Sequence, residues 1–248
     1  MSQEPSRLLA WEPLEIRAEE AHVWSASLDL DESAVHALES VLSLDERERA
    51  GKFFFAFHRK RFVAARGILR TIVSRYAATD PAEITLSYGD HGKPFLSSSC
   101  GPAEIQFNVS HAGDLALIAV TRGRGIGVDI ESIGKRPYNA EVVRRFFSPH
   151  EESVLRLTPD AQRAKMFVAF WTRKEACIKA SGLGLSFTLA SFDVSGNARE
   201  PRVIVSGGDA AQSVRSWTLV DVETVPGCAA ACAVEGMGLS VICREFRL

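Results

Sequence analysis

The sequence has no apolar run that approaches the roughly 20 residues a helix needs to span a bilayer. Its first residues also lack the apolar stretch of a signal peptide. The five cysteines are irregularly spaced and form no CxxC pair, which argues against a zinc site and favours free thiols in a reducing compartment. We therefore expect a cytoplasmic protein that does not enter a membrane.

The chain also has little net charge. Its 29 lysines and arginines against 31 aspartates and glutamates leave a charge of −2, which gives no bulk attraction to nucleic acid or to a membrane surface. There is no low-complexity segment, and 248 residues fit one large domain or two small ones. Basic residues that matter for function must therefore act locally.

Hydrophobic periodicity and cap residues divide the chain into two halves, each with helices, a group of strands and one long helix. The expected helices span 31–42, 43–55, 58–78, 138–147, 148–157 and 160–182. The expected strands span 22–29, 83–89, 103–110, 115–122, 126–131, 187–194, 201–206, 216–222, 227–234 and 239–246. Ser43 and Ser148 are each followed three residues later by a glutamate, the pattern of a helix-starting capping box. These elements predict an α+β fold with two similar α/β lobes, at 1–122 and 123–248.

The segment GVDIE at 127–131 places two acidic residues on one side of an expected strand. Because side chains alternate along a strand, Asp129 and Glu131 share a face and lie about 7 Å apart. Mg²⁺ prefers carboxylate oxygens of this kind, together with phosphate and water. From the spacing alone, a solvated acidic face on an edge strand is the simpler interpretation.

The end of the second long helix, WTRKEACIKASGLGL at 171–185, carries Trp171, Glu175 and Lys179 at i, i+4 and i+8. This spacing puts the three side chains on one face of the helix. Glu175 and Lys179 could form a solvated ion pair. They could also be working groups, with the glutamate as a metal ligand or general base and the lysine holding a phosphate.

Three weaker signals accompany these two. FNVSHAGD places Ser110 and His111 beside a turn, where a hydroxyl, an imidazole and backbone amides can hold a phosphate. DHGKPFL places Lys93 before Pro94 in a tight turn. The helix at 58–78 is rich in arginine. An ordinary turn, a surface hairpin and an amphipathic surface helix explain each of them equally well when it is taken alone.

Taken together and in this order, the motifs resemble the 4′-phosphopantetheinyl transferases of the longer, Sfp-like class. The matching segments are GKP at 92–94, FNVSHAGD at 107–114, GVDIE at 127–131, RRFFSPHE at 144–151 and FWTRKEACIKASGLGL at 170–185. Residues 43–70 also look like the N-terminal helices of the family. The resemblance covers 43–195 well and the two ends loosely.

The resemblance implies a pseudo-dimeric fold that binds coenzyme A between its two lobes. The implied reaction moves the 4′-phosphopantetheine arm of coenzyme A to a serine of an apo acyl or peptidyl carrier protein and releases adenosine 3′,5′-bisphosphate. It further implies a monomer that activates carrier proteins, as in secondary metabolite biosynthesis. The implied metal is Mg²⁺, or Mn²⁺ in its place, held by Asp129, Glu131 and Glu175.

The family pattern also implies roles for individual residues. Catalysis would rest on Asp129, Glu175 as the base, and Lys179, which would stabilise the pyrophosphate and the leaving group. The implied coenzyme A contacts are Arg61, Arg66, Lys93, Pro94, Ser110, His111 and Lys179. Trp171 would pack the helix in place. Candidate charges for docking an acidic carrier protein are Arg122, Arg124, Lys135 and Arg136.

Two other functions are compatible with the same residues. The chain could be a catalytically inactive relative that binds coenzyme A or a carrier protein, although the complete set of acidic positions and Lys179 argues against this. It could also be another metal-dependent enzyme that transfers phosphate or cleaves phosphodiesters. Breakdown of coenzyme A without any carrier protein would favour the second.

Overall fold

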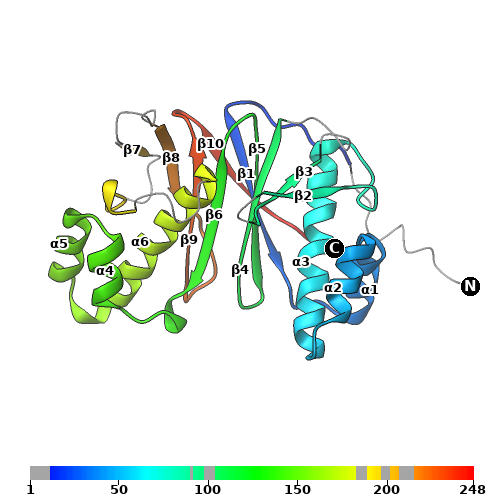
Figure 1. Cartoon of the computed structure of the whole chain (residues 1–248), viewed down its shortest axis with the longest axis horizontal. Coiled ribbons are helices and arrows are strands. Elements are labelled where there is room, and N and C mark those ends of the chain that lie inside the picture. Colours follow the sequence, from blue (N-terminus) through cyan, green and yellow to red (C-terminus); the bar gives the residue numbers. More distant parts are fainter. Residues whose placement is uncertain (1–11, 90–91, 98–103, 183–188, 197–201, 207–214) are drawn as a thin grey trace, which may run out of the picture.

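The computed structural model describes residues 12–89, 92–97, 104–182, 189–196, 202–206 and 215–248 (Figure 1). The helices are α1 Glu32–Ser40, α2 Leu44–Gly51, α3 Ala56–Ala77, α4 Ala140–Phe146, α5 Pro149–Leu157 and α6 Asp160–Ser181, with 3₁₀ turns at Ile133–Lys135 and Leu189–Ser191. The strands are β1 Glu20–Ser27, β2 Leu86–Tyr88, β3 Pro94–Leu96, β4 Ile105–Ala112, β5 Leu115–Arg122, β6 Ile126–Ser132, β7 Arg202–Ser206, β8 Arg215–Asp221, β9 Cys228–Glu235 and β10 Ser240–Glu245.

The strands form two four-stranded sheets and a small hairpin. The first sheet has the order β10-β1-β5-β4, the second has the order β6-β9-β8-β7, and β2 pairs with β3. Strand β10 comes from the end of the chain but pairs in parallel with β1. The sheet of the N-terminal half therefore includes one strand from the C-terminal half.

The two sheets face each other, and each carries its long helix on the outer face (Figure 1). Helix α3 packs on the first sheet and α6 on the second. The layer between the sheets is apolar, with buried side chains from both, among them Ala21, Val23, Leu117, Ala119, Ile126, Val128, Ile130, Cys232 and Val234. The α+β class and the arrangement in two lobes are confirmed.

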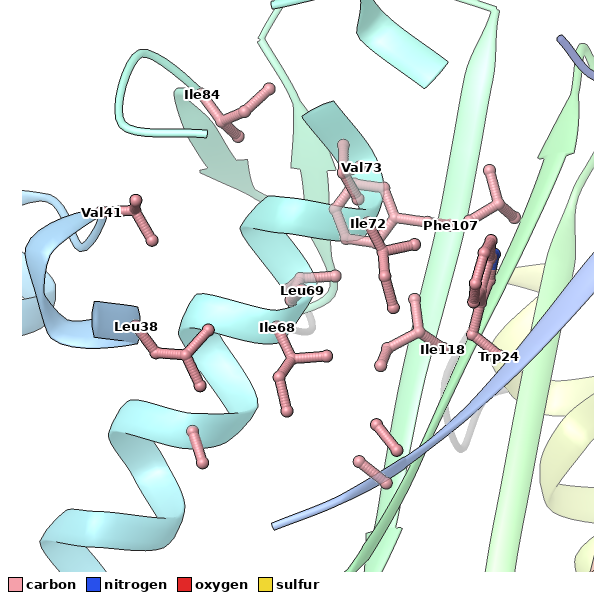
Figure 2. Packing of buried hydrophobic residues seen from close by; sticks show 14 of the residues in the cluster. Trp24, Leu38, Val41, Ile68, Leu69, Ile72, Val73, Ile84, Phe107 and Ile118 are labelled. Carbon is pink, nitrogen blue, oxygen red and sulfur yellow. The ribbon is translucent and has the colours of Figure 1, made fainter. Parts of the chain in front are cut away.

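Alternating side chains explain how one sheet serves two cores. On β5, Leu117 and Ala119 face the second sheet, whereas Ile118 and Val120 face α3. Figure 2 shows Ile118 with Trp24 and Ile72 in the layer between the first sheet and α3. Helix α3 in turn buries its opposite side against α1, where Leu38 lies (Figure 2).

Both expected capping boxes are present and start α2 and α5. In α5, the Glu151 carboxylate accepts from the Ser148 amide at 2.8 Å, and the Ser148 hydroxyl accepts from the Glu151 amide at 3.1 Å. The four cysteines in the described ranges are free thiols, as expected from their spacing. None of the helices in those ranges is long and apolar enough to cross a membrane.

The strand expected at 187–194 is wrong where the structure describes it, because Leu189–Ser191 form a 3₁₀ turn. The buried Lys174 ammonium donates to the carbonyl oxygens of Leu189 at 2.7 Å and Phe192 at 3.0 Å. These two carbonyl oxygens therefore bind the Lys174 ammonium. In a β-strand they would instead accept hydrogen bonds from a neighbouring strand.

Candidate active site

Glycine lets α6 lie directly against β6. A Cβ atom on Gly127 would be 2.0 Å from the Ala176 carbonyl oxygen, and one on Gly125 would be 2.6 Å from that of Ala180. Such separations are too short for any side chain, so only glycine permits this contact. The close approach of helix and strand brings the C-terminal half of α6 beside the acidic residues of β6.

The three aligned residues of α6 form its half-exposed face. Between 171 and 180, Trp171, Glu175 and Lys179 are the positions that are not buried. The neighbouring positions pack into the C-terminal lobe or against β6. The face predicted from the i, i+4, i+8 spacing is therefore turned towards the site and away from the core.

Asp129 is the centre of the site. It lies on β6, is only 4% exposed, and its Oδ1 accepts from the Lys179 ammonium at 2.7 Å and from the Ser110 hydroxyl at 2.9 Å. Its Oδ2 is buried and has no hydrogen-bond partner among the described residues. A buried carboxylate oxygen without a partner is costly, so this atom is suited to accept from, or coordinate, a bound group.

Strand β4 reaches this centre through side chains. The side-chain oxygen Oδ1 of Asn108 accepts from the backbone amide of Val128 at 2.9 Å. The Ser110 hydroxyl accepts from the backbone amide of Ile130 at 3.3 Å. These bonds satisfy backbone donors of the edge strand β6 and join the two lobes. The motif FNVSHAGD therefore acts partly through Asn108, which the sequence-based assignment of site residues did not include.

Glu175 and Glu131 sit close enough to Asp129 to feel its charge. The pKa of Glu175 is raised, first by burial and then by the negative charge of Asp129. The pKa of Glu131 is also raised by burial and by Asp129, although Arg136 counteracts part of this effect. Carboxylates that repel one another in a half-buried place favour a positive group between them.

Arg136 links the acidic strand to Trp171. Its guanidinium donates to a Glu131 carboxylate oxygen at 2.6 Å, and its central carbon lies 4.8 Å from the centre of the Trp171 ring. The indole also contacts Phe146 edge-on and stacks near Phe147. Trp171 therefore packs the helix in place, as expected, and also supports an arginine that holds an acidic residue of the site.

Lys93 binds the end of α6. Its ammonium donates to the carbonyl oxygens of Lys179 at 2.7 Å and Ile126 at 2.9 Å. The C-terminal end of a helix favours a cation because its last carbonyls are unpaired and partly negative. Burial, reinforced by the charge of Lys179, lowers the pKa of Lys93 to about 8. Lys93 thus ties the β2–β3 hairpin, where Pro94 begins β3, to the opposite lobe.

Three other predicted residues belong to the N-terminal lobe and show no contact with Asp129. Arg61 pairs with Asp114 in the β4–β5 turn at 2.6 Å. Arg66 pairs with Glu46 at 2.6 Å and lies over the Tyr88 ring. His111 is exposed and follows Ser110 on β4, so it points to the other face of that strand.

The sequence did not predict a buried ion pair in the C-terminal lobe. Lys174 and Glu151 are both fully buried, and the ammonium nitrogen lies 2.9 Å from a carboxylate oxygen. Glu151 also accepts from the Val194 amide at 2.7 Å. The pair joins RRFFSPHE to WTRKEACIK, so two of the matching motifs meet here in a structural contact. Lys174 and Glu175 are adjacent in the sequence, but only the fold shows that Lys174 is buried while Glu175 is half-exposed.

Within the ranges that the structure describes, no three histidine, cysteine, aspartate or glutamate side chains are grouped so that together they could hold a metal ion. In the arrangement seen here, Lys179 and Arg136 bind two of the carboxylates of the site.

Known proteins are similar to this chain over most of its length. The 4′-phosphopantetheinyl transferase HetI of Nostoc is 37% identical over 91% of this chain and 92% of its own length. The chain belongs to the 4′-phosphopantetheinyl transferases. The family resemblance predicted from the motifs is confirmed.

Two family descriptions divide this phosphopantetheinyl transferase between them. That of the 4′-phosphopantetheinyl transferase superfamily matches 125–233, and that of a 4′-phosphopantetheinyl transferase N-terminal region matches 24–123. A putative 4′-phosphopantetheinyl transferase of Synechocystis is 30% identical over 72% of each chain. The 4′-phosphopantetheinyl transferase Sfp of Bacillus subtilis is 32% identical over 62% of this chain and 66% of its own.

Proposed function

We propose how this enzyme carries out its reaction, the transfer of the phosphopantetheine group of coenzyme A to a carrier protein. The observation that supports the proposal is the half-exposed face of α6, where Glu175 and Lys179 stand beside buried Asp129. One oxygen of Asp129 is held by Lys179 and Ser110, and the other has no partner among the described residues. The coenzyme A pyrophosphate would bind against this face.

The chemistry of the same residues suits a hard divalent cation, although their arrangement in the described ranges does not group three carboxylates closely enough to hold one. The unpartnered Oδ2 of Asp129 and the carboxylates of Glu175 and Glu131 offer oxygen ligands, the type that Mg²⁺ and Mn²⁺ prefer. We propose Asp129 and Glu175 as direct ligands and Glu131 as a third, direct or through water. When bound, Mg²⁺ supplies positive charge beside the pyrophosphate and orients its oxygens.

The chain's own residues account for the rest of the reaction. The serine hydroxyl of the carrier forms a new bond to the phosphorus next to the pantetheine, and the bond from that phosphorus to the bridging oxygen breaks. Adenosine 3′,5′-bisphosphate leaves with that oxygen. Glu175, or a water that it binds, takes the serine proton, since its carboxylate stands beside Asp129 on the half-exposed face of α6. The Lys179 ammonium stabilises the charge on the leaving phosphate.

The coenzyme A contacts remain proposals. We propose that Ser110 contacts the pyrophosphate, because its hydroxyl already binds Asp129. We propose His111, Arg61 and Arg66 as further contacts to phosphate groups. Lys93 and Pro94 would line the nucleotide side, with Lys93 acting mainly by holding the end of α6 in place.

Other features also stay predictions from the sequence. They are the lobe division at 122/123, the cytoplasmic location, the monomeric state, the lack of nucleic-acid binding and a role in secondary metabolism. Strand β10 is the one described strand that pairs across the proposed division. The class of carrier, whether acyl or peptidyl, follows from none of the contacts in the site.

The test is to incubate the enzyme with coenzyme A, an apo carrier protein and Mg²⁺, and to measure released adenosine 3′,5′-bisphosphate by chromatography. We expect release that needs the carrier and stops when EDTA is added. Release that continues in EDTA would contradict the metal site. Coenzyme A binding without release, on several carrier types, would indicate an inactive relative. Release without any carrier would indicate a phosphodiester-cleaving enzyme.

A further inference from the structure

An aromatic patch on the N-terminal lobe, around the start of α3, is exposed to solvent. It consists of Phe53, Phe54, Phe55 and Phe57, which are 37%, 92%, 56% and 51% exposed. The ring centroids of Phe54 and Phe55 are 5.0 Å apart and those of Phe55 and Phe57 are 6.0 Å apart, whereas the Phe53 ring contacts Phe62 at 5.3 Å. Single exposed apolar residues are common, whereas a contiguous cluster of large ones marks a binding surface.

The patch also breaks a local rule of helix formation. Phe55 is the N-cap of α3, and no side chain caps this helix. Serine, threonine, aspartate or asparagine at this position would stabilise the helix by about 1 kcal/mol relative to an apolar residue. Sequences depart from such local preferences chiefly at functional sites.

The patch carries a local positive charge. Between 47 and 61 there are six basic residues and one acidic residue, Glu48, although the whole chain has a net charge of −2. Arg59 and Arg61 have acidic partners in the fold. Lys52 and Lys60 have no ion-pair partner within the described ranges. The charge of this surface therefore complements an acidic partner.

A chain of contacts joins the patch to the site. The Arg61 guanidinium lies 5.5 Å from the centre of the Phe57 ring and pairs with Asp114 in the β4–β5 turn. That turn follows Ser110, which binds Asp129. The start of α3, the β4–β5 turn and the end of β6 lie along the same edge of the molecule, the lower one in Figure 1.

The charges first expected to dock a carrier are largely occupied. Arg122 pairs with Glu104, Arg136 pairs with Glu131, and Arg124 donates to the backbone oxygens of Ala18 and Glu235. These arginines already serve contacts within the protein. The aromatic patch offers what they lack, an apolar centre beside two lysines without ion-pair partners in the described ranges, Lys52 and Lys60, which is the arrangement of a protein interface.

We propose that the aromatic patch docks the carrier protein, through an acidic surface of the carrier with an apolar centre. This inference rests on the proposed function, because the docked protein must present its serine to Asp129 and Glu175. The phenylalanines supply contact area, and the surrounding lysines speed the encounter by charge attraction. The N-terminal lobe thus selects the protein substrate, while the chemistry takes place beside α6.

The test compares apo carrier binding and coenzyme A binding in the same variants. In Phe54→Ser, which removes the most exposed ring of the patch, we expect the carrier Kd and KM to rise about tenfold or more, with unchanged Tm and coenzyme A Kd, since interface aromatics often contribute more than 1.4 kcal/mol. Lys52→Glu/Lys60→Glu should weaken carrier binding and reduce its dependence on salt. Leu157→Ser and Met237→Ser remove side chains that are 79% and 63% exposed elsewhere, and serve as controls.

Two outcomes would overturn the docking proposal. One is an unchanged carrier Kd in the phenylalanine variant. The other is a weakened coenzyme A Kd with normal carrier binding, which would make the patch part of the nucleotide site. Carrier Kd is measured by fluorescence anisotropy without turnover. A failure of the transfer reaction itself would therefore be seen separately from a failure of docking.

Discussion

The ammonium nitrogen of Lys179, on α6, lies 2.7 Å from Oδ1 of Asp129, on β6. The lysine also donates to the Val128 carbonyl oxygen at 3.2 Å and the Ser110 hydroxyl at 3.1 Å. Its charge is thus held in one place, between the two lobes. The ion pair uses only Oδ1 of Asp129. Oδ2 has no partner among the described residues and can still accept from, or coordinate, a bound group.

The first prediction concerns the charge of the two central carboxylates. Asp129→Asn or Glu175→Gln keeps the shape of the site but removes one negative charge. We expect transfer to fall by about 100-fold or more, the usual loss when a charged group at a reacting centre is removed. Tm should change little, and Glu152→Gln on exposed α5 should leave activity unchanged. Full activity in Asp129→Asn or in Glu175→Gln would contradict the proposed site.

Replacing Lys179 should separate turnover from binding. We expect Lys179→Ala to lower kcat by about 100-fold, because the ammonium acts mainly on charge that develops on the leaving phosphate. The Kd for coenzyme A should rise much less. Stopped-flow turnover and calorimetric binding measure the two quantities. An unchanged kcat would remove Lys179 from the chemistry.

The contact of α6 with β6 can be tested with one methyl group. Gly127→Ala puts a Cβ against the Ala176 carbonyl, so the helix must move away from the strand. We expect a loss of about 1–3 kcal/mol in unfolding free energy, as for other overpacked positions, together with reduced transfer. Gly134→Ala is the matched control, since nothing lies within 4 Å of its added Cβ. Equal effects of the two changes would contradict the close packing.

The buried ammonium of Lys93 should make stability depend on pH. Burial lowers its pKa from 10.5 to about 8 in the folded protein. Between these values the unfolded chain binds more protons than the folded one, so this group's contribution to stability should rise as pH rises from about 8 to about 10.5. Lys93→Met removes the effect. The difference in unfolding free energy between wild type and variant should therefore change across this range, and a flat difference would show that Lys93 titrates normally.

Much of the fold could be predicted from local patterns. The 3.6-residue period predicted α3 and α6, and the serine–glutamate pairs marked the starts of α2 and α5. Alternation along β6 placed Asp129 opposite Val128, as observed, because a strand between two layers must turn apolar side chains inward. Spacing together with the family resemblance predicted Asp129, Glu175 and Lys179 as site residues, and the structure brings the three side chains close together, while their roles stay a prediction.

Other features depend on contacts between distant segments. Lys174 looks like a surface lysine in the sequence, but Glu151 and the carbonyls of 189–192 make its burial possible. The same contacts replace the strand expected at 187–194. The role of Asn108 depends on which strand lies beside β4, and the pairing of β10 with β1 has no local signal. Pairing between segments that are distant in the sequence cannot be predicted from any short stretch of it.

The most direct measurement is the intact mass of an apo carrier protein after incubation with coenzyme A, Mg²⁺ and either wild type or Asp129→Asn. The structure predicts that the carrier gains the mass of one phosphopantetheine arm with wild type and gains nothing within the same time with the variant. Wild type should bind coenzyme A both with and without the carrier. Equal mass gains with the two proteins would contradict the assignment of Asp129. No gain with wild type on any of several carriers, despite coenzyme A binding, would contradict the transfer itself.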